Sequence, residues 1–478
     1  MKELLQGQVG VRFGKLTDEQ CAKIHDVSCR ILERVGVEAG HPRAREILRD
    51  AGGKVDGERV RLSRDLIDWA LAKSPPGFTL YGRSEEHSML VEGTNVFYGN
   101  GSETPIMIDH RSGARRQGTL ADVTEGVKLV DALPHIDFVM SFALPWDLDT
   151  DVVYLEQFKA MMANTTKPFA YVAPRLSDVA GMVAMMEAEA GGEDAHRARP
   201  RGLSYINVTH PLRHSQDDLE KLMFVAGKGI PLVYNPAVLR GASGPMTIPA
   251  ALAVANAGEL FGLVLAQLIN EGTPVSLSGG TQDKLDMRST IDVYSAPENR
   301  VAFAEMANWY DKAHWGLGGS TDSKVVDEQA AAEAALSLTL ESLAGSNLIH
   351  DVGYMESGMS NSLAQLVVCD EIIGWIKRFM QPFEVNDETL ALDLIVRVAP
   401  EGDYLLEDHT MNHLNDDWYP RVFDHRTFDK WTAAGGKTLS ERAAGRVDEL
   451  IQKHKVEPLA DELSERFDEI IQEFKTSE

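Results

Sequence analysis

The stretch "DEQAAAEAALSLTLESLAGSNLIHDVGYMES", residues 327–357, decides the fold class because two patterns meet in it. Its first half is rich in alanine, leucine and glutamate, which favour an α-helix. The segment "NLIHDV" that follows is a short apolar run typical of a buried strand. Polar residues come directly after this strand. A helix that leads into a buried strand with a polar end is the repeating unit of a parallel α/β sheet.

The same alternation of helix and apolar strand recurs from about Thr119 onward, and seven such units follow one another. Their strands are short and apolar throughout, as in parallel sheets that helices cover on both faces. No glycine fingerprint of a dinucleotide-binding fold accompanies them. We therefore predict an α/β fold that closes as a (β/α)8 TIM-type barrel, and we place its eighth strand within residues 404–414.

The rhythm of the sequence changes at two points, which divide the chain into three predicted parts. Residues 1–118 contain three helical patterns and then short strands with glycine turns, which predict an N-terminal helical and β-hairpin extension. Residues 119–430 form the predicted (β/α)8 barrel, which would be the catalytic domain. Residues 431–478 form an amphipathic helical tail, for which we expect a role in packing or assembly.

The composition describes a globular protein with a strongly acidic balance of charge. The 478 residues are 44% hydrophobic and 25% charged, and the formal net charge is −26. This charge opposes binding to nucleic acid or to an anionic membrane, since both repel an acidic protein. We find no signal sequence and no apolar run near the ~20 residues of a membrane span. With three cysteines and no Cys-x-x-Cys pair, we expect a cytoplasmic protein.

The polar residues that follow the apolar strands predict the position of the functional site. In a (β/α)8 barrel the chemistry lies at the carboxyl ends of the strands. The opening stretch places an imidazole, two carboxyls and a phenol at such an end, and these form our predicted catalytic group: His350, Asp351, Tyr354 and Glu356. The alternative for each of them is an ordinary hydrogen bond that fixes a loop or a neighbouring strand.

Aromatic residues also gather at the predicted strand ends, with a few carboxyls among them. The faces of aromatic rings suit a quaternary ammonium ion, which has no N–H group to donate. The predicted substrate-binding group combines aromatic, amide, carboxyl and imidazole side chains: Tyr98, Asn100, Glu103, Tyr205, Asn207, His210, Tyr234 and Trp315. Because a pocket has room for few side chains, we expect only some of the aromatic residues to touch the ligand.

Two pairs of histidines have the four-residue spacing of metal ligands on a helix. His409 and His413 stand in "HTMNH", and His210 and His214 stand in "HPLRH", where Pro211 opposes a helix. No third ligand follows either pair at a useful spacing, and the cysteines form no thiolate site. We predict no metal site, and we keep a metal-dependent barrel enzyme that uses His409 and His413 as an alternative.

Three long segments of the chain resemble the trimethylamine methyltransferase superfamily. They are "FYGNGSETPIMIDHRSGARRQGTLADV" at residues 97–123, the stretch at residues 316–374 that contains "NLIHDVGYMES", and "DHTMNHLNDDWYPRVFDHRTFDKW" at residues 408–431. The resemblance covers nearly the whole chain. It implies a (β/α)8 barrel that works with a separate corrinoid protein, so that cobalamin is presented by this partner and is not bound permanently.

One difference from the founding members of that superfamily concerns the substrate. Those members carry pyrrolysine in the region that corresponds to residues 350–359, where this chain has only standard residues. The chain therefore resembles the branch without pyrrolysine, whose members demethylate quaternary amines such as glycine betaine. A quaternary nitrogen leaves as a neutral amine, so methyl transfer to a Co(I) nucleophile needs no general acid or base. The protein would desolvate the cation and align one methyl group.

These considerations assign provisional roles to the predicted site residues. We expect the cation to be held by the ring faces of Tyr98, Tyr205, Trp315 and Tyr354. A carboxylate pressed against the nitrogen would stabilise a charge that disappears as the methyl group leaves, and would slow the transfer. For this reason we expect the two acidic members of the catalytic group, Asp351 and Glu356, to lie outside direct contact. His350 would bind the carboxylate of the substrate, aided by Asn207 or His210.

Several alternatives remain open from the sequence. The same reaction on another quaternary or tertiary amine, such as carnitine, proline betaine or trimethylamine, would need the same kinds of residue. A binding protein for betaine or for the corrinoid protein, without catalysis, is an alternative of a different class. The oligomeric state is also open, and a homo-oligomer is compatible with the helical tail.

Overall fold

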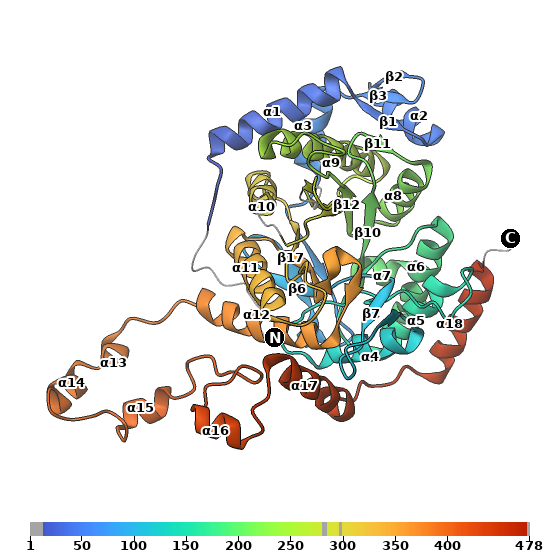
Figure 1. Cartoon of the computed structure of the whole chain (residues 1–478). Helices are drawn as coiled ribbons and strands as arrows, with labels where there is room; N and C mark the ends of the chain where they lie inside the picture. The colour runs from blue at the N-terminus through green and yellow to red at the C-terminus, as the bar shows by residue number, and fades with distance from the viewer. Residues whose placement is uncertain (1–12, 280–283, 296–298, 476–478) are drawn as a thin grey trace.

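The computed structural model describes residues 13–279, 284–295 and 299–475 of the chain. Figure 1 shows helices placed around a central set of short strands. The central strands, in chain order, are β6 (Phe97–Asn100), β9 (Phe169–Tyr171), β10 (Gly202–Val208), β12 (Leu232–Pro236), β13 (Val275–Ser276), β16 (Trp315–Leu317) and β17 (Leu348–Val352). All of their residues are buried except Asn207 in β10, as expected for strands covered on both faces.

The central strands pair in parallel in the order of the chain, and the last strand pairs with the first. β9, β10, β12 and β13 form one sheet, and β16, β17 and β6 form another. Residues 138 and 139 lie between β6 and β9 in the ring. Phe138 forms a parallel bridge with Gly99 of β6, and Val139 forms one with Phe169 of β9. A parallel bridge from Leu277 to His314 connects the end of β13 to the start of β16. The pairings therefore form a ring that returns to its starting strand, so no edge of this ring is open.

One helix accompanies each step around the ring, and one more follows the last strand. They are α4 (Leu120–Ala132), α5 (Val153–Asn164), α6 (Leu176–Ala190), α8 (Gln216–Lys228), α9 (Ile248–Ile269), α10 (Arg300–Trp309), α11 (Glu328–Ala344) and α12 (Leu363–Met380), with the short α7 (Glu193–Ala198) before β10. Local sequence explains their ends. Thr119 and Asp122 form a capping box at the start of α4, and Gly345 takes a left-handed conformation after α11.

The prediction of a strand within residues 404–414 is wrong. Those residues contain the exposed helix α15 (Asp408–His413), and the ring is completed by β6, which lies before the predicted boundary at residue 118. Strand β6 has only four residues, and its partner β17 lies far along the chain. A short apolar run shows that a strand can form, but only long-range packing decides which strand it joins.

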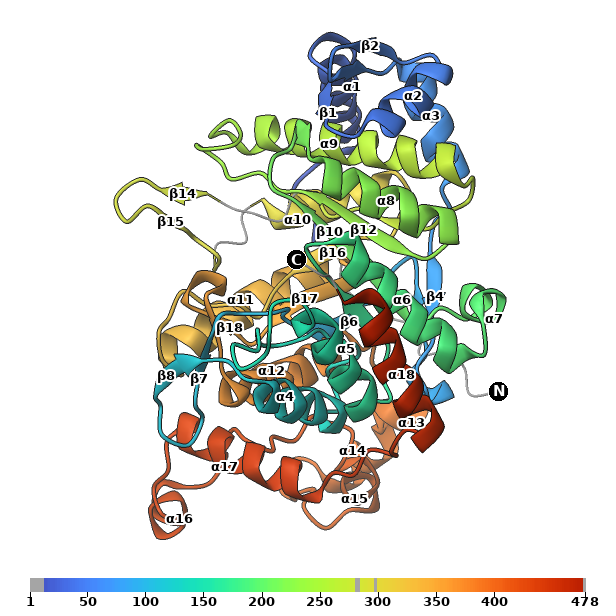
Figure 2. The same cartoon turned by 90° about the vertical axis from the view of Figure 1, so that its right-hand side faces the viewer.

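Hairpins stand at both ends of the ring. β4 (Phe78–Leu80) and β5 (Met89–Val91) pair where the central strands begin, and their apolar side chains join the inner core. The hairpins that follow central strands are β7 (Ile106–Ile108) with β8 (Arg115–Gln117), β14 (Leu285–Asp286) with β15 (Ile291–Asp292), and β18 (Tyr354–Met355) with β19 (Ser360–Asn361). Figure 2 shows β4 on one side of the ring and these later hairpins on the other, where the central strands end.

The N-terminal part packs across the long helix α9. It comprises α1 (Asp18–Arg34), α2 (Pro42–Asp50), α3 (Arg64–Lys73) and the strands β1 (Val37–Ala39), β2 (Lys54–Asp56) and β3 (Arg59–Arg61), to which β11 (Arg213–His214) adds in parallel. Ser28 of α1 donates a hydrogen bond of 3.0 Å to the Ala253 carbonyl, and Asn256 donates one of 2.9 Å to Ser28. These bonds fix α1 against α9.

Helix α9 corrects our expectation that no segment has the length and hydropathy of a membrane span. Its 22 residues include an 18-residue window with a mean hydropathy of 1.7. However, 83% of that window is buried inside the protein, between the N-terminal helices and the ring. A helix that is apolar all round and buried all round is a core helix.

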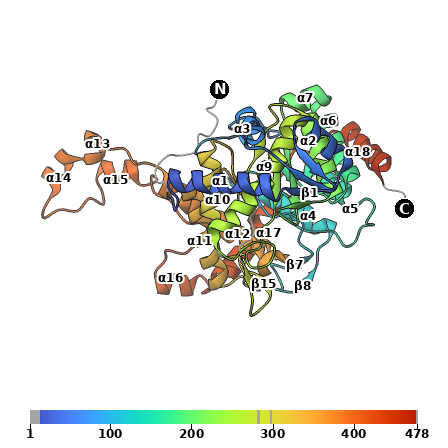
Figure 3. The ribbon, with the colours of Figure 1, turned by 90° about the horizontal axis from the view of Figure 1, so that it is seen from above.

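The C-terminal part leaves the body of the protein and then returns to it. Residues 381–417, which we call the arm, carry α13 (Asp387–Leu390), α14 (Leu392–Val398) and α15, and none of these helices has a buried residue. Figures 1 and 3 both show the arm projecting away from the ring. Glu371 of α12 accepts hydrogen bonds from three successive backbone N–H groups at residues 421–423, which anchors the returning chain. The remaining helices are α16 (Phe428–Ala433), α17 (Leu439–Lys453) and α18 (Asp461–Phe474).

Candidate functional site

A stack of aromatic rings lies inside the ring of strands, below the ends of β10, β16 and β17. The Trp315 ring is 4.4 Å from the His350 ring and 5.3 Å from the Tyr205 ring, between centroids. Phe138 also packs against Trp315 at 5.6 Å, and Tyr205 meets His350 edge to face at 5.5 Å. The alternation of a β-strand explains this gathering, because every second residue of each strand points inward.

His350 is buried in this stack as a neutral imidazole. Its Nδ1–H donates a hydrogen bond of 2.6 Å to the Gly316 carbonyl on the neighbouring strand. Burial, with a smaller effect of the nearby cation Arg300, lowers the pKa of His350 to about 3. A cationic imidazolium that binds a substrate carboxylate is therefore disfavoured here, and Nε2, 3.6 Å from Asp351 Oδ2, is the nitrogen left for other contacts.

Two carboxyl groups near the end of β17 are held toward their protonated forms. Burial raises the pKa of Asp351 well above its usual value, against the opposing effect of Arg300. Desolvation raises the pKa of Glu103 to about 7, although Ser141 donates it a hydrogen bond of 3.0 Å. The charge of Glu103 also raises the pKa of Asp351, which indicates that the two groups are close enough to interact. The pair therefore offers a site where a bound cation would favour the ionised form of the carboxyls.

Asp351 stands at a sharp change of backbone direction. Its φ is +67°, which is unusual for a residue other than glycine, and Gly353 follows with a φ of +96°. This turn ends β17 and starts the hairpin that carries Tyr354. Backbone strain of this kind costs about 1–3 kcal/mol and is concentrated at functional sites.

Tyr354 extends the aromatic surface beyond the end of β17. Its hydroxyl shares a hydrogen bond of 3.0 Å with Ser102, and its ring lies close over Gly101, where a Cβ atom would approach the ring to 1.9 Å. The ring of Tyr294 lies 6.4 Å away. Burial raises the pKa values of both phenols well above the usual value, and the charge of Asp351 does so too, which places the two rings near that carboxyl.

A row of polar side chains crosses the ends of β10, β12 and β13. Asn235 donates hydrogen bonds of 3.0 Å to the Tyr205 hydroxyl and to the side-chain oxygen of Asn207. The Ser278 hydroxyl lies 2.7 Å from Oδ1 of Asn235 and 2.7 Å from Oε1 of Glu259, and it shares its one proton between them. Asn207 is exposed at the end of this row, so an amide dipole is available to a ligand there. The row ties Tyr205 to its neighbours and orients it.

Two aromatic residues that we predicted for the site point outward from the ring of strands, toward the surrounding helices. The Tyr98 hydroxyl shares a hydrogen bond of 2.7 Å with Ser342 of α11, and the Tyr234 hydroxyl bonds His214 at 2.9 Å. Both rings belong to the core between strands and helices rather than to the core inside the ring. The expectation that Tyr98 and Tyr234 line the site is therefore wrong, because the sequence did not reveal which residues of these short strands point inward.

Three further predicted residues have structural roles instead. Asn100 bonds the backbone of Met140 with both its amide groups, at 2.8 and 2.9 Å, and so joins β6 to the next segment. Glu356 pairs with Arg115 of β8 at 3.0 Å. His210 accepts a hydrogen bond of 3.2 Å from the Leu212 backbone near the N-terminal sheet. The structure thus brings together Tyr205, Asn207, Trp315, His350, Asp351, Tyr354 and Glu103, and leaves Tyr98, Asn100, His210, Tyr234 and Glu356 outside that group.

Sequence reasoning missed several residues of this group. Phe138 and Asn235 stand within apolar strand segments, where inward orientation was the missing information. Tyr294 and Arg300 follow the β14–β15 hairpin and have no motif around them. Arg300 donates a hydrogen bond of 3.1 Å to the Leu317 carbonyl and is buried, so its charge reaches the interior. Only its position in the fold reveals this.

Comparison with known proteins identifies the family. The family model described as trimethylamine methyltransferase (MTTB) matches residues 9–477. A glycine betaine methyltransferase of Desulfitobacterium hafniense (strain Y51) is 31% identical over 454 residues, which cover 94% of each chain. A trimethylamine methyltransferase MttB of Desulfitobacterium hafniense (strain DSM 10664 / DCB-2) is 29% identical and covers 97% of this chain and 94% of that protein.

The chain belongs to the trimethylamine methyltransferase family and is an enzyme of the amine methyltransferase class. The predicted family is confirmed. Among solved structures, the crystal structure of the hydroxylamine MtmB complex matches with a TM-score of 0.51 and 11% identity, covering 92% of this chain and 89% of that one. At this identity the match concerns the α/β fold alone.

Proposed function

We propose that this enzyme transfers a methyl group from a quaternary amine, glycine betaine in the first place, to the cobalt of a corrinoid protein. The ring of parallel strands would be a (β/α)8 TIM-type barrel, formed by residues 97–380 between the N-terminal part and the C-terminal helices. The observation that carries the proposal is the stack of Tyr205, Trp315 and His350 with Tyr354 at its edge. These ring faces can bind a cation that donates no hydrogen bond. A relative with 31% identity is named a glycine betaine methyltransferase.

The protonation states of the site fit a reaction in which no proton moves. His350 is neutral and donates its Nδ1–H to a backbone carbonyl, so it is a poor general acid. The substrate nitrogen already carries its positive charge and leaves as a tertiary amine, dimethylglycine in the case of glycine betaine. The task of the residues is then to strip water from the cation and to point one methyl group out of the ring of strands.

The two carboxyls would change the charge of the site without direct contact with the substrate nitrogen. While Asp351 and Glu103 carry protons, neither contributes a negative charge to the site, and an approaching cation favours their ionised forms. The exposed amide of Asn207, rather than His350, is the donor best placed for the carboxylate of a betaine. This revises the expected carboxylate ligand from the imidazole to the amide.

The corrinoid would approach where the later hairpins stand. Around this end the apolar side chains of Met246, Met287 and Ile291 are 48%, 62% and 45% exposed, a surface on which the carrier protein could dock. The cobalamin, when its carrier docks, supplies a Co(I) nucleophile that takes the methyl group. A carrier of reduced cobalt implies a reducing compartment, so we propose a cytoplasmic enzyme.

Turnover of glycine betaine with a reduced corrinoid protein tests the proposal directly. We expect dimethylglycine to form, and we expect Tyr354→Leu to raise KM roughly 5- to 30-fold, since a cation–π contact contributes about 1–2 kcal/mol. Tyr98→Phe is the matched control, because that ring lies outside the site, and its KM should equal that of the wild type. If Tyr354→Leu leaves KM unchanged while Asp351→Asn abolishes activity, a charge-pairing site replaces the aromatic one.

The same assay separates the alternatives. Carnitine, proline betaine and trimethylamine are offered in turn under identical conditions, and the substrate with the highest kcat/KM defines the specificity. Binding of betaine by calorimetry without turnover of any of these amines would identify a binding protein and contradict the proposed function.

A further inference from the structure

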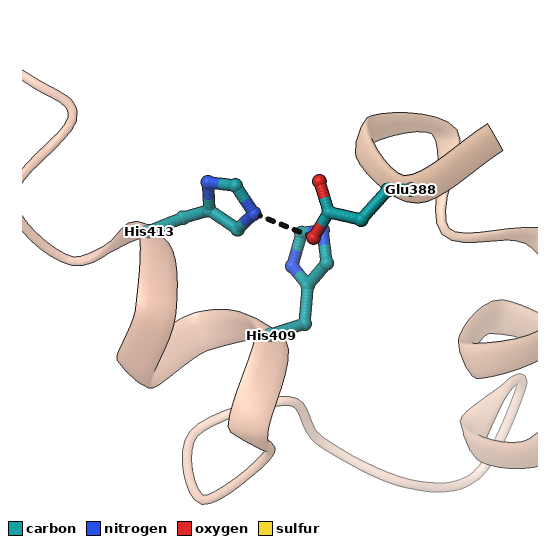
Figure 4. Close-up of side chains that lie close together, drawn as sticks. All are labelled: Glu388, His409 and His413. Carbon is teal, nitrogen blue, oxygen red and sulfur yellow. Dashed lines mark hydrogen bonds and ion pairs between the residues drawn. The ribbon is translucent and has the colours of Figure 1, made fainter. Parts of the chain in front are cut away.

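Three side chains in the arm form a cluster that the methyl transfer does not use. His409 and His413 lie on one face of α15, and Glu388 approaches them from α13 (Figure 4). One nitrogen of each histidine and one oxygen of Glu388 lie within 4.8 Å of one another. The sequence showed the two histidines but not the carboxylate, because only the folded arm brings α13 beside α15.

We propose that Glu388, His409 and His413 bind a divalent metal ion, with Zn²⁺ as the expected metal. Two imidazoles and one carboxylate are a common set of zinc ligands, and three protein ligands leave one tetrahedral position for water. This site is separate from the methyltransferase site and does not depend on the proposed function. It replaces our prediction of no metal site with a proposal.

A simple ion pair does not explain the cluster. Glu388 Oε1 lies 2.9 Å from His413 Nε2, which a charged hydrogen bond would satisfy. The Nε2 atom of His409, however, is enclosed by the protein and has no hydrogen-bond partner among the described residues. Its ring lies 4.5 Å from the His413 ring, so its free nitrogen belongs to the same cluster. A metal ion would satisfy this atom and would take the place of the bond between Glu388 and His413.

A second carboxylate, that of Asp416, holds the ring of His413 at its other nitrogen. Asp416 forms a short hydrogen bond with Nδ1 of His413, on the side of the ring away from Glu388. A carboxylate that holds the far nitrogen of a ligating histidine fixes the ring and its tautomer, an arrangement typical of zinc sites. The Nε2 atom of His413 is thereby aimed at the space between Glu388 and His409.

The site would also give the arm the internal support that it otherwise lacks. None of α13, α14 and α15 has a buried residue, so no hydrophobic core holds them together. A small segment without a core commonly gains its structure from a metal ion. The ion would join α13 to α15 across the intervening 17 residues, from 391 to 407.

Metal content of the full-length chain tests this site. The chain is stripped with a chelator, dialysed against Zn²⁺, and assayed for bound metal, while Co²⁺ loading is followed by its absorption in the visible range. We expect one Zn²⁺ per chain and the spectrum of a tetrahedral Co²⁺ site. His409→Ala and Glu388→Gln should abolish both signals, and Asp416→Asn should weaken the affinity about 10- to 100-fold.

Two matched controls keep the test sharp. His425 and Glu401 are exposed, belong to the same C-terminal part and lie outside the cluster, so His425→Gln and Glu401→Gln should bind Zn²⁺ like the wild type. All the substituted side chains lie on exposed helices or loops, so circular dichroism should confirm an unchanged fold. A wild-type chain without stoichiometric Zn²⁺, or a His409→Ala variant that binds Zn²⁺ as tightly as the wild type, would overturn the proposal.

A different observation concerns the surface of the arm. Its helices and loops expose large apolar side chains, with exposed fractions from 57% to 93%: Phe383, Val385, Leu390, Leu392, Val396, Leu405, Leu406, Met411 and Leu414. Together they present an area on the order of the ~800 Å² that one partner contributes to a standard interface. An apolar surface of this extent on a projecting segment marks an interaction site.

The body of the same chain carries an apolar groove that matches this surface. The groove has a volume of about 420 Å³ and lies between α11 and α12, with Ala335, Ile372, Trp375 and Phe379 among its lining residues. Trp375 and Phe379 are 56% and 59% exposed. No residue of the arm lines this groove in the same chain, and Figure 3 shows the arm projecting away from the body.

We infer that the groove is covered by the arm of a second copy of this chain. Two copies related by a two-fold axis would each insert an arm into the groove of the other. The dimer would then cover both arms and both grooves. Any other protein would need two separate surfaces, one for the arm and one for the groove. The exchange requires no residue of the methyltransferase site.

Molar mass in solution decides this question. We expect light scattering on the eluted full-length chain to give the mass of two chains, and the double variant Leu405→Glu with Leu406→Glu to give that of one. Both side chains are more than 70% exposed, so the fold should tolerate the change. Val325→Glu, at an exposed apolar residue outside the arm, is the control and should stay dimeric. A monomeric wild type, or a double variant with unchanged mass, would overturn the inference.

Discussion

At the residue scale, burial shifts the imidazole and the carboxyls of the site toward their uncharged forms. His350 loses its proton because burial lowers its pKa to about 3, and Asp351 keeps its proton because burial raises its pKa. A neutral, largely apolar interior has little water to compete with a bound cation. Electrostatic attraction in such a place is stronger than at the surface, so a single ionised carboxyl has a large effect on cation affinity.

The pKa of Glu103 leads to a prediction about pH. Its folded value is about 7 because of desolvation, so the group is neutral at pH 6 and ionised at pH 8. A cation binds better to the ionised form, and we expect the apparent affinity for glycine betaine to rise about 10-fold between these pH values, a difference of about 1.4 kcal/mol. Glu103→Gln should give a KM that no longer changes with pH in this range.

A second buried carboxyl provides the control for that prediction. Burial also raises the pKa of Glu341 to about 7, but its hydrogen-bond partner is Ser346, before the start of β17. Glu341→Gln should leave the pH dependence of KM in place. Either carboxyl binds its proton more tightly in the folded chain than in the unfolded one, so each lowers the free energy of unfolding as pH rises from 4.5 toward 7. A KM of the wild type that is flat from pH 6 to 8 would contradict the role of Glu103.

At the element scale, the hairpin β18–β19 delivers Tyr354 to the site, and a glycine before β7 makes room for it. A Cβ atom at Gly101 would lie 1.9 Å from the Tyr354 ring and 2.3 Å from a second ring atom. Gly101→Ala must therefore displace the ring or the backbone. We expect the free energy of unfolding to fall by about 1–3 kcal/mol and the KM for glycine betaine to rise, measured by denaturant unfolding and by the methyl-transfer assay.

A glycine in helix α17 serves as the counterpart. Nothing lies within 4 Å of a Cβ atom built at Gly445, and the residue is in the helix interior. Gly445→Ala should raise the free energy of unfolding by about 0.5–1 kcal/mol, because alanine loses less conformational freedom in a helix. Its KM should not change. Equal KM values for the two alanine variants would show that the position of Tyr354 does not matter for binding.

At the scale of the whole molecule, the contact between β6 and β17 organises the protein. It joins the first and last strands of the ring, and it places Tyr354 against Gly101 and Glu103 near Asp351. The arm lies outside this arrangement and is connected to it through α12, whose Glu371 anchors the returning chain. The proposed methyltransferase site and the proposed metal site therefore lie in separate regions of the molecule.

The sequence by itself determined the local elements and the chemical character of the site. Apolar strands that alternate with helices, as in residues 327–352, predict a parallel α/β fold because hydrophobic periodicity is a local property. The polar ends of the strands likewise located His350, Asp351 and Tyr354. These residues lie within seven positions of one another, so their proximity needs no long-range information.

Only the tertiary structure decided which residues face the interior and which distant segments meet. Tyr98 and Tyr205 are equally apolar strand residues, yet Tyr98 faces α11 and Tyr205 faces Trp315. A shift of one residue in a strand exchanges its two faces, and short strands carry too little pattern to fix that choice. Likewise, Glu388 joins His409 and His413 only because the arm folds back on itself. Such contacts depend on packing between segments far apart in the chain, which local sequence does not encode.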